Sequence, residues 1–210
     1  MKSFQLVFSD RHPIIHDGNN ILLIDTGAPT TIHSADKLNF CSVDFDCTTN
    51  YLGVTVSDIS ALLGTNITTL LGADILSEFT IVFDYKKNTV EFGNSSQGFN
   101  GKEIPLSNFM GVPIIEATVN QQKLKFFIDS GAKLSYLPES IANQYKSVGM
   151  EADYYPGIGK FETICYEIPT EIDSHELVVK YGILPPELQM GRMPAEIDGI
   201  IGYDFFKNFK

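Results

Sequence analysis

The 210-residue sequence contains no tryptophan, only three cysteines, and fewer basic than acidic residues. Cys41, Cys47 and Cys165 lack Cys-x-x-Cys spacing, which disfavours a disulfide framework or a zinc site. Fifteen Lys and Arg against 26 Asp and Glu give a net charge of −11, which argues against nucleic acid or an anionic membrane as a partner. No apolar run reaches the roughly 18 residues of a transmembrane helix, and no secretory signal is visible. We therefore expect a cytoplasmic protein without an integral membrane segment.

The histidines are equally sparse and give no sign of a metal site. They are scattered at His12, His16, His33 and His175. The His175 segment lacks the second histidine of a zinc-protease helix. No metal or organic cofactor is expected.

The residues that are abundant favour short strands. Hydrophobic residues make up 43% of the chain, enough for a sizeable core, and 17 Gly and 10 Pro supply turns. Strands are expected at Phe4–Phe8, Ile21–Ile24 and Phe126–Ile128, a hairpin at Thr80–Phe92, and a short helix at Pro138–Tyr145. The sequence predicts a mainly β fold.

Two segments of the chain occur twice, in the same order. Ile21–Ala28 (ILLIDTGA) returns as Lys125–Ala132 (KFFIDSGA), 104 positions later. Leu70–Phe79 (LLGADILSEF) returns as Ile200–Phe209 (IIGYDFFKNF), 130 positions later. Such self-similarity indicates a duplicated unit.

A polar, glycine-rich stretch separates the two copies, and its composition is typical of a linker. We predict an N-terminal lobe at residues 1–93, a linker at 94–102 and a C-terminal lobe at 103–210. The first copy continues into the Thr80–Phe92 hairpin, whereas the second matches only as far as Phe209. Either the native chain runs further, or another segment such as Phe4–Phe8 takes the place of the missing hairpin.

The repeated Asp lies where an apolar strand enters a tight turn. The following Gly allows a positive φ, and the Thr or Ser hydroxyl can bond back to the backbone. If the lobes face one another across a pseudo-two-fold axis, Asp25 and Asp129 meet at their junction. Two carboxylates so close share one proton. One can then act as a base toward water while the other polarises a carbonyl group.

These motifs resemble those of the retropepsin-like aspartic proteases, in a single-chain form with two fused halves. Ile24–Ala28 and Ile128–Ala132 match the family's active-site motif, and Leu70–Gly72 and Ile200–Gly202 match its second motif. The resemblance implies two pseudo-symmetric β-barrel lobes with short helices and an active site at the lobe interface. It implies an aspartic endopeptidase that acts as a monomeric pseudo-dimer on an extended peptide or protein substrate.

The resemblance also implies roles for particular residues. Asp25 and Asp129 would be catalytic, and the active-site loops would comprise Thr26, Gly27, Ala28, Ser130, Gly131 and Ala132. Pepsins usually carry Ser or Thr where this chain has Ala28 and Ala132. Without a hydroxyl donor there, the carboxyl pair should hold its shared proton to higher pH, so we expect a mildly acidic or neutral optimum.

A flap that closes over the substrate is expected from the second lobe alone. Asp25 and Gly72 are 47 positions apart, whereas Asp129 and Gly202 are 73 apart. The longer interval holds two apolar strands around a Gly-rich tip, with flap residues predicted at Tyr155, Gly157, Ile158, Gly159 and Lys160. The alternative is an ordinary surface hairpin. In the shorter interval, Tyr51–Val56 is expected to continue the core sheet.

Two other functions fit the same motifs. One is a catalytically weak retropepsin-fold module for interaction or dimerisation. The other is a regulatory protease of narrow specificity that ignores generic substrates.

Overall fold

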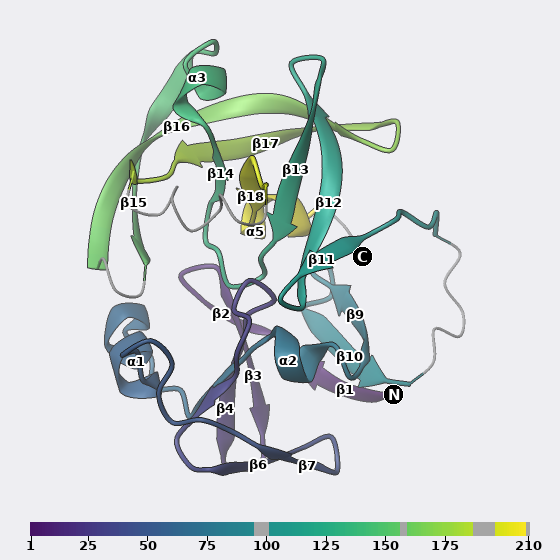
Figure 1. Cartoon of the computed structure of the whole chain (residues 1–210), viewed down its shortest axis with the longest axis vertical. Coiled ribbons are helices and arrows are strands. Elements are labelled where there is room, and N and C mark those ends of the chain that lie inside the picture. Colours follow the sequence, from purple (N-terminus) through teal and green to yellow (C-terminus); the bar gives the residue numbers. More distant parts are fainter. Residues whose placement is uncertain (95–100, 156–158, 187–195, 209–210) are drawn as a thin grey trace.

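The computed structural model describes residues 1–94, 101–155, 159–186 and 196–208 (Figure 1). We call the parts before and after the glycine-rich stretch the first and second lobes. The first contains β1 (Lys2–Gln5), β2 (Val7–Ser9), β3 (His12–Asp17), β4 (Asn20–Ile24), β5 (Ile32–His33), β6 (Lys37–Phe40), β7 (Val43–Asp46), α1 (Val56–Leu63), β8 (Thr69–Leu71), α2 (Ala73–Leu76), β9 (Thr80–Asp84) and β10 (Thr89–Gly93). The second contains β11 (Ser107–Phe109), β12 (Val112–Val119), β13 (Gln122–Ile128), β14 (Ser135–Leu137), α3 (Glu139–Ala142), β15 (Ser147–Tyr155), β16 (Gly159–Ile172), β17 (His175–Ile183), β18 (Gly199–Ile201) and α5 (Tyr203–Phe206). The predicted mainly β fold is confirmed.

Both lobes are built around the same strand order. The first-lobe sheet runs β2-β3-β4-β8-β5, and the second-lobe sheet contains the equivalent order β11-β12-β13-β18-β14. In each, the strand before the Asp motif lies parallel to the strand before the second motif: β4 pairs with β8, and β13 with β18. The two sequence repeats therefore correspond to two copies of one arrangement.

The lobes differ between their two motifs. The second-lobe sheet is extended by β17, β16 and β15, of which β15 and β16 form a long antiparallel hairpin. In the same interval the first lobe has the separate β6–β7 hairpin and helix α1 (Figure 1). The additional residues of the second interval are therefore used for strands that the first lobe lacks.

The expectation that Tyr51–Val56 continues the core sheet is wrong. Among the described residues, Tyr51 and Val54 pair only with each other, around a turn in which Leu52 and Gly53 have φ of 51° and 84°. Thr55 then caps α1: its side chain accepts a bond from the Asp58 backbone N–H, and the Asp58 carboxylate accepts one from the Thr55 N–H. This capping box starts a helix where strand propensity alone favours a sheet.

Strands β1, β10 and β9 form another sheet, and Phe83 of its β9 meets Phe206 of the second lobe at 6.2 Å between ring centroids. The prediction of one strand at Phe4–Phe8 is wrong, because Phe4 belongs to β1 and Phe8 to β2. Since β1 pairs with β10 of its own lobe, the alternative in which Phe4–Phe8 replaces a second-lobe hairpin does not hold. Helix α5 of the second lobe instead packs on first-lobe aromatic rings. Phe206 stacks on Tyr85 at 5.5 Å between ring centroids, and Tyr203 meets Phe8 edge-on at 5.4 Å.

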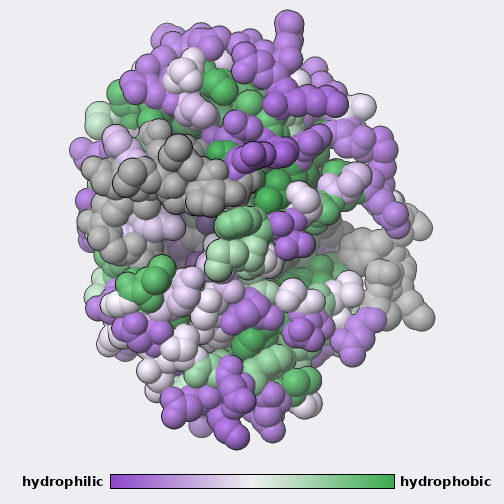
Figure 2. All heavy atoms as spheres, in the orientation of Figure 1, coloured by the Kyte–Doolittle hydropathy of each residue, from purple (hydrophilic) through white to green (hydrophobic). Residues whose placement is uncertain are grey.

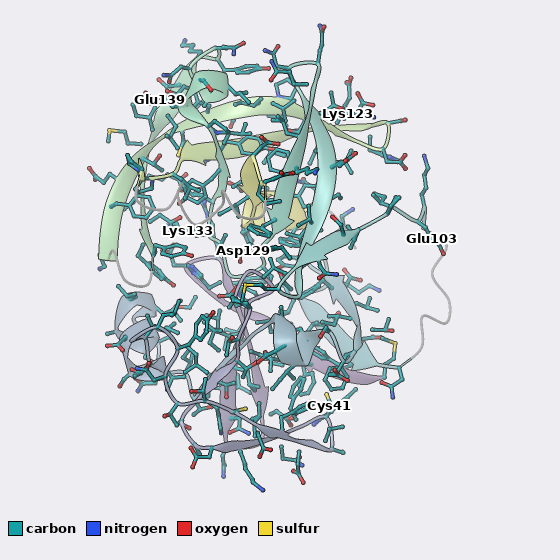
Figure 3. The ribbon with its side chains drawn as sticks, in the orientation of Figure 1. Cys41, Glu103, Lys123, Asp129, Lys133 and Glu139 are labelled. Atoms are coloured by element: carbon teal, nitrogen blue, oxygen red, sulfur yellow. The ribbon has the colours of Figure 1, made fainter. Side chains whose placement is uncertain are left out.

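Each lobe has its own hydrophobic core beside this shared layer. In the second lobe the core includes the fully buried Phe126 and Tyr181, and in the first lobe it includes Phe40, whose ring meets Phe92 at 5.0 Å. Hydrophilic side chains cover the far ends of both lobes in the view of Figure 2. The two cores hold the motif-bearing strands in place at the junction, where Figure 3 labels Asp129.

Candidate active site

Asp25 and Asp129 immediately follow equivalent strands, β4 and β13. The Asp25 backbone N–H donates to the Leu71 carbonyl at 3.0 Å, and the Asp129 N–H donates to the Ile201 carbonyl at 2.9 Å. Both acceptors lie directly before the glycine of the second motif. The second motif thus holds each Asp at the end of its strand, which explains why the two motifs are repeated together.

The glycine of each motif allows the opposite carboxyl group to approach. A Cβ atom at Gly27 would lie 2.2 Å from Asp129 Cγ, and one at Gly131 would lie 2.4 Å from Asp25 Cγ. Real Cβ atoms do not approach other heavy atoms so closely, so only glycine fits at either position. The Asp25 carboxylate also accepts bonds from the Gly27 and Ala28 N–H groups at 3.0 and 2.9 Å.

The hydroxyls of Thr26 and Ser130 join the two loops across the lobe interface. Thr26 Oγ1 donates to the Ile128 carbonyl at 2.7 Å and accepts from the Ser130 N–H at 2.9 Å. Ser130 Oγ reciprocates by donating to the Ile24 carbonyl at 2.8 Å and accepting from the Thr26 N–H at 3.1 Å. Both side chains are buried, and this two-fold network fixes the separation of the loops that carry the Asp residues.

The two carboxyl groups are hydrogen-bonded to each other and titrate as a pair. Burial raises the pKa of Asp25, although the hydrogen bond with Asp129 and the Gly27 and Ala28 N–H groups act in the opposite direction. Burial and the neighbouring charge of Asp25 raise the pKa of Asp129 well above its ordinary value. The arrangement therefore favours one proton shared between the two carboxyl groups.

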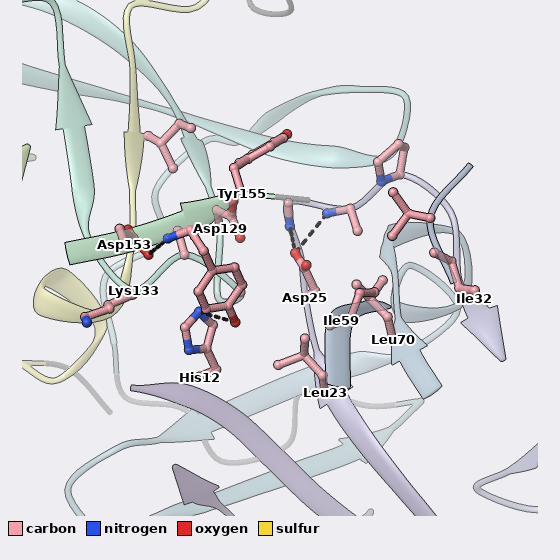
Figure 4. A pocket seen from close by; sticks show the side chains of 18 of the residues that line it. His12, Leu23, Asp25, Ile32, Ile59, Leu70, Asp129, Lys133, Asp153 and Tyr155 are labelled. Atoms are coloured by element: carbon pink, nitrogen blue, oxygen red, sulfur yellow. Dashed lines mark hydrogen bonds between the residues drawn. The ribbon is translucent and has the colours of Figure 1, made fainter. Parts of the chain in front are cut away.

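The pair borders a cavity of about 270 Å³ between the lobes. Figure 4 shows its two sides: Ile32, Ile59 and Leu70 gather on one side of Asp25, whereas His12, Lys133 and Asp153 lie on the other. The apolar side belongs to the first lobe. At the repeat offset of 104, Ile32 corresponds to Tyr136, whose hydroxyl donates to the Asp153 carboxylate. The cavity is thus chemically asymmetric although the lobes share a fold.

The β15–β16 hairpin approaches the carboxyl pair, but not every predicted flap residue reaches the cavity. Tyr155 lines it, and burial together with the charges of Asp129 and Asp25 raises the pKa of Tyr155 to about 12. Gly159 and Lys160 do not line it, whereas Phe161 does. Lys160 and Phe161 are neighbours on β16, so their side chains point to opposite faces. Gly157 and Ile158 lie outside the described residues.

Sequence reasoning missed several residues that line the cavity. His12 is one of four histidines without a motif, and Asp153 and Tyr136 belong to no motif either. The repeat offset of 104 is a signal for Tyr136, because it gives Tyr136 the same place after its Asp motif that Ile32 has in the first lobe. Leu52 also lines the cavity, from the turn before α1 rather than from the strand predicted there. The Thr55–Asp58 capping pattern is the sequence signal for this turn.

Within the described ranges, no group of three or more His, Cys, Asp or Glu side chains is arranged to hold a metal ion. The three cysteines are free thiols. No helix in the described part of the chain has the length and apolar character needed to cross a membrane.

No protein-family model matches the chain, and no curated protein sequence does. Among solved structures, the chain is similar to the simian foamy virus (mac) protease, at 16% sequence identity and a TM-score of 0.32, over 42% of this chain and 86% of the viral one. It is similar to the EIAV protease complexed with an inhibitor, at 15% identity and a TM-score of 0.35, over 53% of this chain and 92% of the viral one. Each viral chain is thus covered almost whole by about half of this chain.

Proposed function

We propose that the chain is an aspartic endopeptidase, with Asp25 and Asp129 as its catalytic pair. The observation that carries this proposal is the meeting of two carboxyl groups, from equivalent turns in two lobes, at a cavity between those lobes. Such a pair with one shared proton supplies a base and an acid at the same point. The retroviral protease names among the similar structures agree with this chemistry.

The two carboxyl groups take the two roles, with Asp25 as the base and Asp129 as the acid. Asp25 takes a proton from water as the water oxygen attacks the peptide carbonyl carbon. Asp129 donates the proton that the pair shares to the carbonyl oxygen. When the tetrahedral diol collapses, the C–N bond breaks, Asp25 passes its proton to the leaving amine, and Asp129 recovers a proton from the diol hydroxyl. The cycle needs no metal or organic cofactor.

The substrate is an extended peptide lying between the first lobe and the β15–β16 hairpin. Tyr155 contacts it from the hairpin, and the apolar side chains of the first lobe take one of its apolar residues. The carboxyl pair requires residues from both lobes, so one chain with two fused halves forms one site and works as a monomer.

Peptide-library cleavage by the purified chain tests this function, with Asp25→Asn as the matched control. The substitution keeps the shape of the side chain and removes the base, so cleavage should fall at least about 100-fold. Binding of a statine-containing peptide inhibitor should be lost when both carboxyl groups are replaced. Inhibitor binding that survives this double replacement, or no cleavage by the wild type, would favour a catalytically weak interaction module.

A further inference from the structure

The β2–β3 turn of the first lobe and its equivalent in the second lobe have the same backbone but opposite chemistry. Asp10 and Arg11 have φ of 44° and 74°, and the corresponding Met110 and Gly111 have φ of 51° and 83°. A Cβ at Gly111 would lie 3.4 Å from Ala73, so the second turn faces apolar α2. The first turn is polar and charged. Strands β15 and β16 belong to the second lobe and have no counterpart in the first. The first turn therefore has a neighbour that the second turn lacks.

His12 follows the polar turn and contacts β15 of the opposite lobe. Its ring is 3% exposed and lies 5.1 Å from the Tyr154 ring, at 24° between planes. Nδ1 lies 3.0 Å from the Ser9 carbonyl, which only accepts hydrogen bonds, so Nδ1 carries the proton. Nε2 is then an acceptor, and the Tyr154 hydroxyl donates to it at 3.1 Å. This hydrogen bond joins His12, which lines the cavity, to strand β15.

Ion pairs beside His12 hold the same stretch of β15. Arg11 pairs with Glu151 at 3.0 Å, and Glu151 also accepts from Lys180 of β17 at 2.6 Å. Lys133, next to the second Asp motif, bonds the Ala152 carbonyl at 2.9 Å and Asp10 at 2.8 Å. Residues 151–154 are therefore connected to the first lobe at several adjacent points.

These connections compensate for the position of β15 in its sheet. Among the described strands β15 pairs only with β16, so its other edge has no backbone partner. Side-chain contacts with the first lobe then determine where this edge lies relative to Asp25 and Asp129. A strand that projects over a cavity without such contacts moves readily.

We propose that His12 is a positioning residue, which holds β15 of the second lobe over the carboxyl pair through the hydrogen bond from Tyr154. The inference rests on the proposed protease function, in which β15 and β16 cover the substrate. Burial lowers the pKa of His12 against the opposing effect of the facing carboxylates Asp10, Asp25 and Asp153, and so keeps Nε2 available as an acceptor.

Four variants separate the hydrogen bond from packing. His12→Phe retains a ring and removes both nitrogens, and Tyr154→Phe removes only the hydroxyl. His12→Gln retains an acceptor for Tyr154. His16→Phe makes the same chemical change at an exposed position of the same strand. The double variant of His12→Phe with Tyr154→Phe measures coupling between the two side chains.

In the kinetic measurement, His12→Phe and Tyr154→Phe should each raise KM, and the inhibition constant of a statine-containing peptide, by about 3- to 10-fold, as expected for one neutral hydrogen bond. The value of kcat should change less than about twofold. The double variant should be no worse than either single one, His12→Gln should recover most of the affinity, and His16→Phe should match the wild type. Additive losses, or equal losses in His12→Gln, would contradict the assignment.

Hydrogen–deuterium exchange tests the same contact without using activity. Amides of residues 147–155 should exchange at least about threefold faster in His12→Phe and Tyr154→Phe, but not in His16→Phe. Unchanged exchange in both variants overturns the proposal even if the wild type is an active protease. If the wild type neither cleaves peptides nor binds the inhibitor, the protease function fails, and the positioning role fails with it; faster exchange then shows only a structural contact.

Discussion

The Cα atom of Gly27 faces the carboxyl group of Asp129 at a distance that leaves no room for a methyl group. Gly27→Ala should therefore push the two loops apart and separate the carboxyl pair. We expect cleavage to fall at least about 100-fold, with a destabilisation of about 1–3 kcal/mol from overpacking. Peptide hydrolysis and urea unfolding measure the two effects. Gly101→Ala is the control, since no atom of the residues that the structure describes lies within 4 Å of its Cβ position and the variant should behave as wild type.

Ala28 lies beside the same carboxyl pair and, unlike serine, has no hydroxyl that could donate to it. Its backbone N–H donates to the Asp25 carboxylate at 2.9 Å, so a serine side chain here lies close to that oxygen. A hydroxyl donor favours the ionised form, and Ala28→Ser should lower the pKa of the pair and move the pH optimum down by about one unit. A pH–rate profile of kcat/KM measures this shift. An optimum that stays in place, or moves up, would show that the alanine does not set the titration.

At the scale of elements, the Tyr51–Val54 turn places the apolar side chain of Leu52 at the cavity, where it does not contribute to the core. Tyr51 and Val54 pack on the first-lobe core, whereas Leu52 is 86% exposed and has a φ of 51°, which favours Asn or Gly. We expect Leu52 to contact substrate. Leu52→Asn should leave the melting temperature unchanged or higher and raise KM by about 3- to 10-fold.

Leu106→Asn provides the comparison for Leu52→Asn, because Leu106 is 55% exposed and does not line the cavity. Its KM should equal that of the wild type. Equal kinetic effects of the two substitutions would refute a specific role for the Leu52 turn.

The strands and helices show which parts of the fold could be predicted from the sequence. Strands β4 and β13 were predictable because each ends in apolar residues directly before the repeated Asp motif. Helix α1 was missed because its first residues are β-branched or polar, and the Thr55–Asp58 capping box outweighs that propensity. The contact of His12 with Tyr154 joins residues 142 positions apart, and no local pattern predicts such a pair.

At the scale of the whole molecule, buried carboxyl groups link stability to pH in opposite directions. Burial raises the pKa of Asp129, Asp25 and Asp153, so their contribution is present at low pH and lost as pH rises through the folded pKa. Burial acts to raise the pKa of Glu151, but Lys180 and Arg11 together outweigh it and lower this pKa, so the contribution of Glu151 is lost as pH falls. The net charge of −11 adds repulsion toward high pH. We expect the melting temperature to be highest at mildly acidic pH.

Asp129→Asn isolates the contribution of the carboxyl pair to this pH dependence. The amide cannot ionise, so the variant should melt about 3–6 °C above the wild type near pH 8, corresponding to about 1–2 kcal/mol. The difference should shrink as pH falls and the wild-type pair regains the proton that the high pH removed. Asp46→Asn, which removes one exposed carboxylate, controls for net charge and should show almost no difference. An equal gain in melting temperature at high and at low pH would mean that the amide stabilises by packing. Folding would then not raise the pKa of the carboxyl pair.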